Sequence, residues 1–398
     1  MPLSHAGRTS RPIFVAATRQ HVGKTSVSLA LMSGLKKRFD TTGFMKPVGQ
    51  QHLVVNANDG TPVKVDKDVK LVREHFDLAH IDYKVMSPVI IPVGYTRDYI
   101  DGKIDKLAQF NSIKASLDAQ RKISDVLLLE GTGHIGVGSC ININNAQVAA
   151  LCGADMVLVA NGGIGQAFDD LELNYTMCKS KGVRVAGVII NKVLPSKYDQ
   201  TKKYMTALLK ENWGVPLLGC VPDKPFLGCP ALADLEHLFK TELLSGRAFR
   251  MRHYNVTETN LVTTSLNRFL ENLRDKPSRT MYVTHVTRND IILGFLAEHQ
   301  RKQAEGKSFE AALVVCGRKP RYDIFPEIKD MVQSLNAPVL HVEQSTYKAM
   351  EQIQQFTPKL NIDDKTRVNQ AIAHYEPYID FDLLLKRTCD NNWSVPNK

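Results

Sequence analysis

The feature that most constrains the fold is a strand, a short loop and a helix that follow one another near the start of the chain. The apolar run Ile13–Ala17 predicts a buried strand of a parallel sheet. The loop after it ends in Gly23-Lys24-Thr25, and from there apolar residues recur at helical spacing. The pattern predicts a strand–loop–helix unit in an α/β protein.

This unit has the chemistry of a phosphate-binding loop. Backbone N–H groups of the loop and the first helical turn point at phosphate oxygens, Lys24 reaches the β- and γ-phosphates, and Thr25 ligates a Mg²⁺ shared with the nucleotide. Thr18 stands where the usual pattern has glycine. The alternative is an ordinary turn with a surface lysine, but a cation at a helix N-terminus requires an anion beside it. We therefore expect ATP to bind here, at Thr18, Val22, Gly23, Lys24, Thr25 and Ser26.

Two further segments carry charged residues that this pocket could use. Residues 43–48 predict a second strand whose end bears Lys46, and ligands of open parallel sheets bind at the carboxyl ends of strands. A surface lysine that caps the strand is the equal alternative. Asp66 and Asp68 lie at the start of a predicted helix, where carboxylates are stabilised as caps without any functional role.

A second strong signal is the apolar strand Val126–Leu129, which ends in Glu130 and a glycine-rich turn. A carboxylate at this place is typical of the Walker B strand, whose acid orients Mg²⁺ and its water. An acid that merely ends a strand is the alternative, and the phosphate-binding loop in the same sheet argues against it. We predict a metal or phosphate role for Glu130.

Three motifs together resemble the dethiobiotin synthetase family and the similar N-terminal region of long bacterial phosphate acetyltransferases: Val22-Gly23-Lys24-Thr25, Lys46-Pro47-Val48 and Glu130-Gly131-Thr132-Gly133. The resemblance covers about residues 12–239. It implies that Lys24, Lys46 and Glu130 act on the phosphate and substrate. It also implies that Thr25, Asp68 and Glu130 hold Mg²⁺.

The same resemblance assigns residues to the base of the nucleotide. Asn191, near the end of the predicted strand segment 183–193, corresponds to the residue that reads the adenine, and Pro222 lies in the turn that borders it. One departure concerns the substrate: Gly49-Gln50-Gln51 stands where the family has the small hydroxyl residues that meet the diamine. The implied nucleotide site is therefore retained, whereas dethiobiotin synthesis is not supported.

The second half of the chain predicts a smaller α/β domain with strands at residues 280–284, 311–316 and 338–342. Thr287-Arg288-Asn289-Asp290, after the first of these strands, resembles the start of a DRTGG domain. The predicted fold is thus a P-loop NTPase-type parallel sheet with helices on both faces, followed by a DRTGG-like α/β domain. We expect an ATP-binding domain at 11–241, a helical connector at 242–278, the DRTGG-like domain at 279–388 and a loose tail at 389–398.

The composition of the chain indicates in which cellular compartment it is expected and which classes of partner it is expected to bind. The net charge is +10, from 51 basic and 41 acidic residues, but the basic residues are spread out and no nucleic-acid module is recognisable. No apolar run reaches the ~20 residues of a membrane span. The seven cysteines form no C-x-x-C pair, and a strand beginning at Ile13 leaves no room for a full signal peptide. We expect an intracellular homo-oligomer in a reducing compartment, an organelle included, that binds neither membranes nor nucleic acid.

Two functions follow from these expectations. The first is enzymatic: Mg-ATP is hydrolysed, or it activates a small carboxylate or other anion. The second is regulatory: the site senses a nucleotide with slow turnover or none, and the DRTGG-like domain reports its state. Retention of both lysines and both acids favours the enzyme. The changed substrate residues, and the lack of any counterpart of the acetyltransferase catalytic domain in these 398 residues, favour the sensor.

Overall fold

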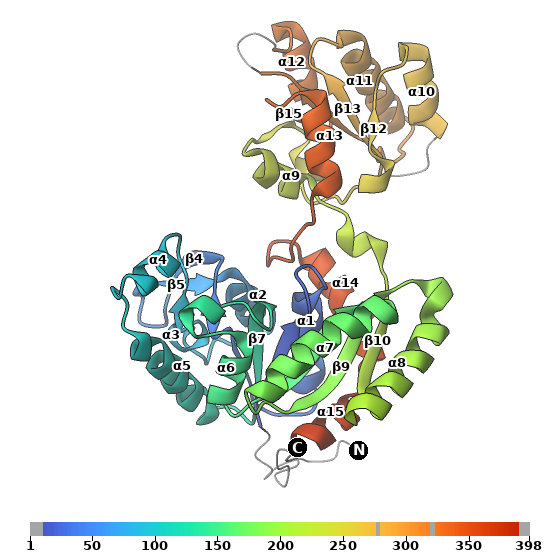
Figure 1. Cartoon of the computed structure of the whole chain (residues 1–398). Coiled ribbons are helices and arrows are strands. Elements are labelled where there is room, and N and C mark those ends of the chain that lie inside the picture. Colours follow the sequence, from blue (N-terminus) through green and yellow to red (C-terminus); the bar gives the residue numbers. More distant parts are fainter. Residues whose placement is uncertain (1–10, 276–278, 319–322, 390–398) are drawn as a thin grey trace. The chain divides into compact units, whose positions relative to one another are not determined.

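The structure, a computed structural model, describes residues 11–275, 279–318 and 323–389. The chain divides into two compact units (Figure 1). Unit 1 comprises residues 1–224 and 360–398, and unit 2 comprises residues 225–359. Each unit has its own sheet with helices packed against it.

The centre of unit 1 is a six-stranded parallel sheet. In spatial order its strands are β10 (Leu217–Pro222), β9 (Val185–Val193), β8 (Asp155–Asn161), β1 (Ile13–Ala17), β7 (Val126–His134) and β2 (Thr42–Met45). All five residues of β1 are buried, because β1 lies between β8 and β7 and both faces of the sheet are covered. The predicted strand at residues 13–17 is confirmed.

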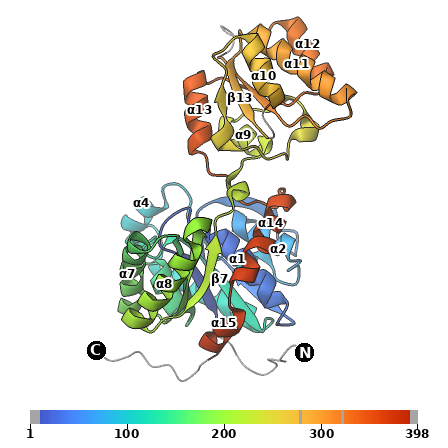
Figure 2. The ribbon, with the colours of Figure 1, turned by 90° about the vertical axis from the view of Figure 1, so that its right-hand side faces the viewer.

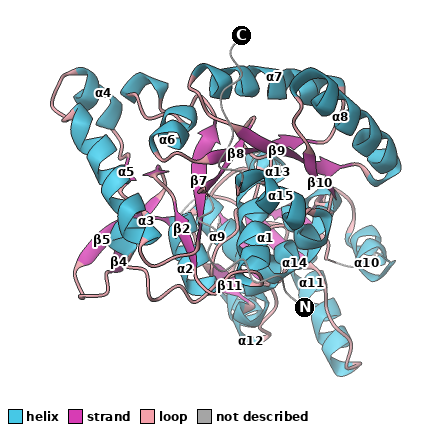
Figure 3. Ribbon diagram, turned by 90° about the horizontal axis from the view of Figure 1, so that it is seen from below, coloured by secondary structure: helices cyan, strands magenta, loops and turns pink. Residues whose placement is uncertain are grey.

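Helices cover both faces of this sheet, as predicted. Figure 3 shows one layer with α6 (Asn145–Leu151), α7 (Gly165–Ser180) and α8 (Tyr198–Trp213) and an opposite layer with α1 (Lys24–Lys36), α14 (Lys365–Tyr375) and α15 (Phe381–Thr388). Between β2 and β7 the chain forms further short strands and helices: β3 (Val48–Gly49), β4 (His52–Asn56), β5 (Pro62–Asp66), β6 (Val89–Ile90), α2 (Lys67–His75), α3 (Tyr83–Met86), α4 (Tyr95–Ile100) and α5 (Lys106–Arg121). Of these, α2, α3 and α5 pack on β2. Among the described helices, none is long and apolar enough to cross a membrane.

The end of the chain belongs to unit 1, which differs from the predicted domain boundaries. Residues 279–388 were expected to form one domain, but α14 packs on α1, and α15 packs on β9 and β10. Asp380 N–H donates to the Leu218 carbonyl at 2.8 Å, and Gly34 of α1 makes room for the Phe381 ring. The apolar spacing of a helix predicts that it is buried but does not say which sheet it covers. Of the predicted loose tail, residues 390–398 lie outside the described residues.

The sheet of unit 2 has five strands in the order β11 (Leu243–Ser245), β15 (Val339–Val342), β14 (Ala312–Cys316), β13 (Met281–His285) and β12 (Asn260–Leu261). All neighbours are parallel except β11 and β15. The three predicted strands correspond to β13, β14 and β15. The segment 242–278, predicted as a helical connector, instead supplies both edge strands and α10 (Leu266–Asp275). Strands of two or three residues are too short to show a period of two.

Two apolar layers complete unit 2. α10, α11 (Asn289–Ala304) and α12 (Pro326–Ser334) enclose one core with the inward side chains of the sheet. α9 (Leu232–Phe239) and α13 (Thr346–Gln355) enclose the other, and Figure 2 shows α13 and α10–α12 on opposite sides of β13.

The contact between α1 and α15 generates a stability prediction. A Cβ atom at Gly34 would lie 2.0 Å from the Phe381 ring, so either α15 or α1 must shift to admit it. We expect Gly34→Ala to lower the free energy of unfolding by about 1–3 kcal/mol despite the better helix propensity of alanine. Urea unfolding measures this change in the free energy of unfolding. Gly165→Ala, at a helical glycine with no atom within 4 Å of the added carbon, is the control. Equal stability of the two variants would contradict the packing of α15 on α1.

Candidate functional site

The loop between β1 and α1 is held in place by its neighbours in the sheet. Thr18 N–H donates to the Val159 carbonyl of β8 at 2.9 Å, and the Val22 carbonyl accepts a hydrogen bond from the Asn191 amide at 2.6 Å. Gly23 has a φ of +88°, which a residue with a Cβ rarely adopts, and an added Cβ would lie 2.4 Å from Asn191 Nδ2. The loop therefore presents the first turn of α1, with Lys24 and Thr25, at the carboxyl edge of the sheet.

Lys46 lies in a cage of three carboxylates. Its Nζ atom is 3.0 Å from Asp66 Oδ1 and 3.7 Å from Glu130 Oε1, and it hydrogen-bonds to Asp68 Oδ2. All four side chains are buried. The structure thus brings together three of the predicted site residues, Lys46, Asp68 and Glu130, from three separate segments. Asp66 joins them, and it also caps α2 by accepting from Asp68 N–H at 3.0 Å.

The charges in this cluster shift one another's pKa values. Burial lowers the pKa of Lys24 to about 8, because its charge loses water, although nearby Glu130 partly offsets this. Burial acts in the same direction on Lys46, but the adjacent carboxylates of Asp68 and Glu130 outweigh it and raise its pKa above the usual range. Burial would raise the pKa of Asp68, yet Lys46 lowers it, so that ion pair stays charged.

Glu130 lies where β7 passes β1, paired with Val15. Thr25 Oγ1 donates to Glu130 Oε1 at 3.3 Å, whereas Glu130 Oε2 is buried with no hydrogen-bond partner among the described residues. Burial raises the pKa of Glu130, and Lys46 opposes that rise. A buried carboxylate oxygen without a partner, next to a threonine hydroxyl, is an oxygen donor set of the kind that Mg²⁺ accepts.

Within the described part of the chain, no group of three or more His, Cys, Asp or Glu side chains could hold a metal by itself. Asp68 and Glu130 supply two carboxylates, and Asp68 is engaged by Lys46. Mg²⁺ commonly binds through one or two carboxylates together with substrate phosphates and water. The residues present therefore fit a Mg²⁺ that arrives with a nucleotide.

Asn191 and Pro222, which were expected beside the base of the nucleotide, lie near the ends of β9 and β10. Asn191 is fully buried at the end of β9, where its Oδ1 atom accepts from Lys192 N–H at 2.8 Å while Nδ2 donates to Val22. Lys192, with a φ of +55°, extends its Nζ atom to the His21 carbonyl at 2.8 Å. The Pro222 carbonyl at the end of β10 lies 2.8 Å from His374 Nε2.

Several residues of this region had no signal in the sequence. Asn145 accepts from Thr132 N–H at 3.0 Å and donates to the Thr132 and His134 carbonyls, so it holds the turn that follows Glu130. The Tyr375 hydroxyl lies beside the side chains of Asn191 and Ser26, which oppose the rise of its pKa that burial causes. In the sequence Tyr375 is only one apolar position of a helical stripe, and its partners are far away along the chain.

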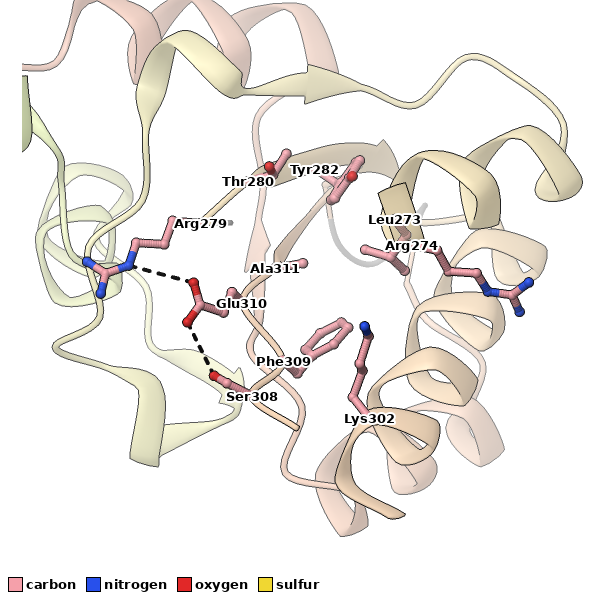
Figure 4. A pocket seen from close by; sticks show the side chains of 10 residues that line it. All are labelled: Leu273, Arg274, Arg279, Thr280, Tyr282, Lys302, Ser308, Phe309, Glu310 and Ala311. Atoms are coloured by element: carbon pink, nitrogen blue, oxygen red, sulfur yellow. Dashed lines mark hydrogen bonds and ion pairs between the residues drawn. The ribbon is translucent and has the colours of Figure 1, made fainter. Parts of the chain in front are cut away.

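A second pocket lies in unit 2, and Figure 4 shows it from close by. Tyr282 and Phe309 give it an aromatic wall, and three cationic side chains lie at its rim: Arg274, Arg279 and Lys302. Arg274 is 3.2 Å from Glu298, and Arg279 is 3.9 Å from Glu310. Two of the three cations therefore already face carboxylates.

Comparison with protein families agrees with the two-part organisation. The AAA_26 family, described as an AAA domain, matches residues 11–231, and the DRTGG domain matches residues 234–356. The DRTGG match begins inside the predicted ATP-binding domain and includes the segment that was predicted as a connector. The helices α14 and α15, which complete unit 1, lie outside both matches.

Curated relatives have the same architecture. The phosphate acetyltransferase of Nitratidesulfovibrio vulgaris is 24% identical over 389 residues, which cover 95% of this chain and 52% of that protein. The phosphate acetyltransferase of Escherichia coli is 22% identical over 413 residues, which cover 97% of this chain and 54% of that protein. The chain thus spans about half the length of the relatives it matches.

Among solved structures, the MinD cell division protein of Aquifex aeolicus is 14% identical, with a TM-score of 0.33. The match covers 55% of this chain and 84% of the MinD chain.

The family matches cover the residues from which the resemblance to dethiobiotin synthetase and DRTGG domains was predicted, and both expectations are confirmed. The chain belongs to the AAA_26 family, as a dethiobiotin synthetase-like P-loop domain followed by a DRTGG domain, and it is homologous to phosphate acetyltransferases.

Proposed function

We propose that the chain binds Mg-ATP at the P-loop of unit 1 and hydrolyses it or uses it to activate a small anionic substrate such as a carboxylate. The observation that supports this most directly is the meeting of Lys24, Thr25, Lys46 and Glu130 at the carboxyl edge of β1, β2 and β7. Two ammonium groups, a hydroxyl and a partly unsatisfied carboxylate are the groups that phosphoryl transfer uses.

Each group has a separate role in this proposal. Lys24, at the start of α1, binds the β- and γ-phosphates together with the backbone N–H groups of the loop. Thr25, Glu130 and Asp68 would hold Mg²⁺, which supplies neutralisation of phosphate charge when bound. The loop itself, through Thr18, Val22, Gly23 and Ser26, surrounds the phosphates, while Asn191 and Pro222 face the base.

Lys46 is the residue proposed to meet the transferred phosphoryl group or the anionic substrate. In the ligand-free site its charge is neutralised by Asp66, Asp68 and Glu130. An incoming γ-phosphate competes for it with these carboxylates. Binding therefore requires that Lys46 exchange at least one carboxylate for the ligand, and a metal ion at Asp68 and Glu130 would favour that exchange.

The same cage favours a second candidate function, which is nucleotide sensing with slow turnover or none. Moving the Lys46 ammonium group from three carboxylates to a phosphate costs free energy. If this exchange is slow, the chain binds nucleotide but hydrolyses it slowly or not at all. In this case the DRTGG unit reports the state of the P-loop, as a regulatory half related to that of phosphate acetyltransferases. Homo-oligomerisation, an intracellular location and the absence of nucleic-acid binding remain predictions.

Phosphate release and nucleotide binding distinguish these functions. We expect the purified chain to bind Mg-ATP, and Lys24→Ala to weaken binding by roughly 10- to 100-fold because a charge-assisted contact to phosphate is lost. Calorimetric titration with Mg-ATP measures affinity, and release of inorganic phosphate measures turnover. Turnover lost in Lys24→Ala supports the enzyme, whereas Lys24-dependent binding without turnover supports the sensor.

The matched control is Lys114→Ala, which makes the same change at an exposed position of α5. It is expected to bind and turn over nucleotide like the unmodified chain. Failure of the unmodified chain to bind Mg-ATP at all would refute the P-loop proposal in both of its forms.

The lowered pKa of Lys24 predicts how nucleotide affinity depends on pH. Phosphate binds the ammonium form, which predominates in the free site only below its pKa of about 8. Affinity should therefore be constant near pH 7 and fall by up to tenfold per pH unit above pH 8, with uptake of a proton on binding. Titration calorimetry at pH 9 in buffers of different ionisation enthalpy detects that proton. Binding at pH 9 without proton uptake is the result that this assignment does not allow.

A further inference from the structure

The helix that follows unit 2 reaches the P-loop. The chain leaves unit 1 just after β10 and returns to it shortly before α14. α14 packs along α1, and Glu376 at its end accepts from Ser33 Oγ of α1 at 2.7 Å and pairs with Lys37. The residues that contact the P-loop from this direction lie outside both family matches, so neither match accounts for them.

Tyr375, the last residue of α14, lies close to the P-loop. Its side chain is 4% exposed, and its hydroxyl lies beside the polar side chains of Asn191 and Ser26. A Cβ built on Gly23 would lie 3.3 Å from this hydroxyl, which shows how closely Tyr375 approaches the loop. Burial raises the pKa of Tyr375, so the hydroxyl keeps its proton and can both donate and accept.

His374, the residue before Tyr375, contacts the end of β10 at Pro222. His374 Nε2 is 2.8 Å from the Pro222 carbonyl, at the point where β10 ends and the chain departs for unit 2. Its ring lies against Tyr375 and Tyr378, with centroids 5.5 and 5.7 Å away. Two consecutive residues of α14 thus contact the P-loop, the end of β9 and the end of β10.

These contacts lock Asn191 in one orientation. The Asn191 amide donates to the Val22 carbonyl and lies beside the Tyr375 hydroxyl, and its oxygen accepts from Lys192 N–H. Without the hydroxyl of Tyr375, Ser26 and Asn191 lose a polar neighbour that they share, and the first turn of α1 is held less firmly.

We propose that Tyr375 is a positioning residue of the nucleotide site, which holds Ser26 and Asn191 in the arrangement that binds nucleotide. Through it, the helix that returns from unit 2 sets the affinity of the P-loop. This inference rests on the proposed function, because it concerns the same site. It adds a residue that belongs to neither matched domain. It also makes nucleotide binding depend on the segment with which the chain returns from unit 2 to unit 1.

Tyr375→Phe tests the proposal, since it removes only the hydroxyl. We expect Mg-ATP affinity to fall by about five- to tenfold, the effect of losing one polar contact within the site. Tyr378→Phe is the matched control: it makes the same change three residues later, where Tyr378 packs on Tyr198 and His374 and its side chain is 38% exposed. The control should bind like the unmodified chain.

A purely structural role would lower the stability of the ligand-free protein without changing affinity for nucleotide. Both are therefore measured, the first by urea unfolding and the second by calorimetric titration with Mg-ATP. In addition, hydrogen exchange of residues 365–375 should slow when Mg-ATP binds to the unmodified chain, and it should not slow in Lys24→Ala. This readout does not depend on whether the Tyr375→Phe protein folds.

The outcomes separate the two proposals. Nucleotide binding that depends on Lys24, with equal affinity of Tyr375→Phe and Tyr378→Phe, overturns the role of Tyr375 and leaves the proposed function standing. Unchanged hydrogen exchange in α14 on binding has the same meaning. If the unmodified chain binds no Mg-ATP, both proposals fall together.

Discussion

The buried ion cluster around Lys46 is the interaction on which the organisation of unit 1 depends. Three carboxylates, from Asp66, Asp68 and Glu130, surround one ammonium group out of contact with water. Buried charges are tolerated only when they are paired, so the segments that carry them must meet: the end of β2, the start of α2 and the middle of β7. That requirement places the acids and the lysines at one edge of the sheet, beside the first turn of α1.

The sequence predicted the parts of this site that lie in short motifs. A strand with a glycine-containing loop and a helix is recognisable within a few residues, as is an apolar strand that ends in Glu130. Lys46 could be placed near the phosphates because ligands bind at the carboxyl ends of parallel strands, whereas the role of Asp68 was implied only by the resemblance to dethiobiotin synthetase. Asp66 was expected to cap a helix without any functional role. In the structure it does so and also pairs with Lys46, and its Oδ1 atom makes both contacts.

The parts that could not be predicted depend on contacts between distant residues. Val368, Ala371 and Tyr375 are spaced like the buried face of a helix, but an apolar stripe fits any apolar surface of suitable shape. Only the structure shows that this stripe meets α1 and that Phe381 fits over Gly34. The edge strands β11 and β12 were missed for a different reason, because two or three residues do not carry a detectable alternation.

The discontinuity of unit 1 has a consequence for the order in which the chain can fold during its synthesis. Residues 225–359 form unit 2 without interruption, so that unit can close as soon as it has left the ribosome. The sheet of unit 1 is made earlier, but the face that α14 and α15 cover remains without them until the last described helices emerge. Until then unit 1 is incomplete although its sheet is synthesised first, and its apolar surface is open to chaperones or to other chains. A fragment cut at the end of the first family match would keep that surface exposed permanently.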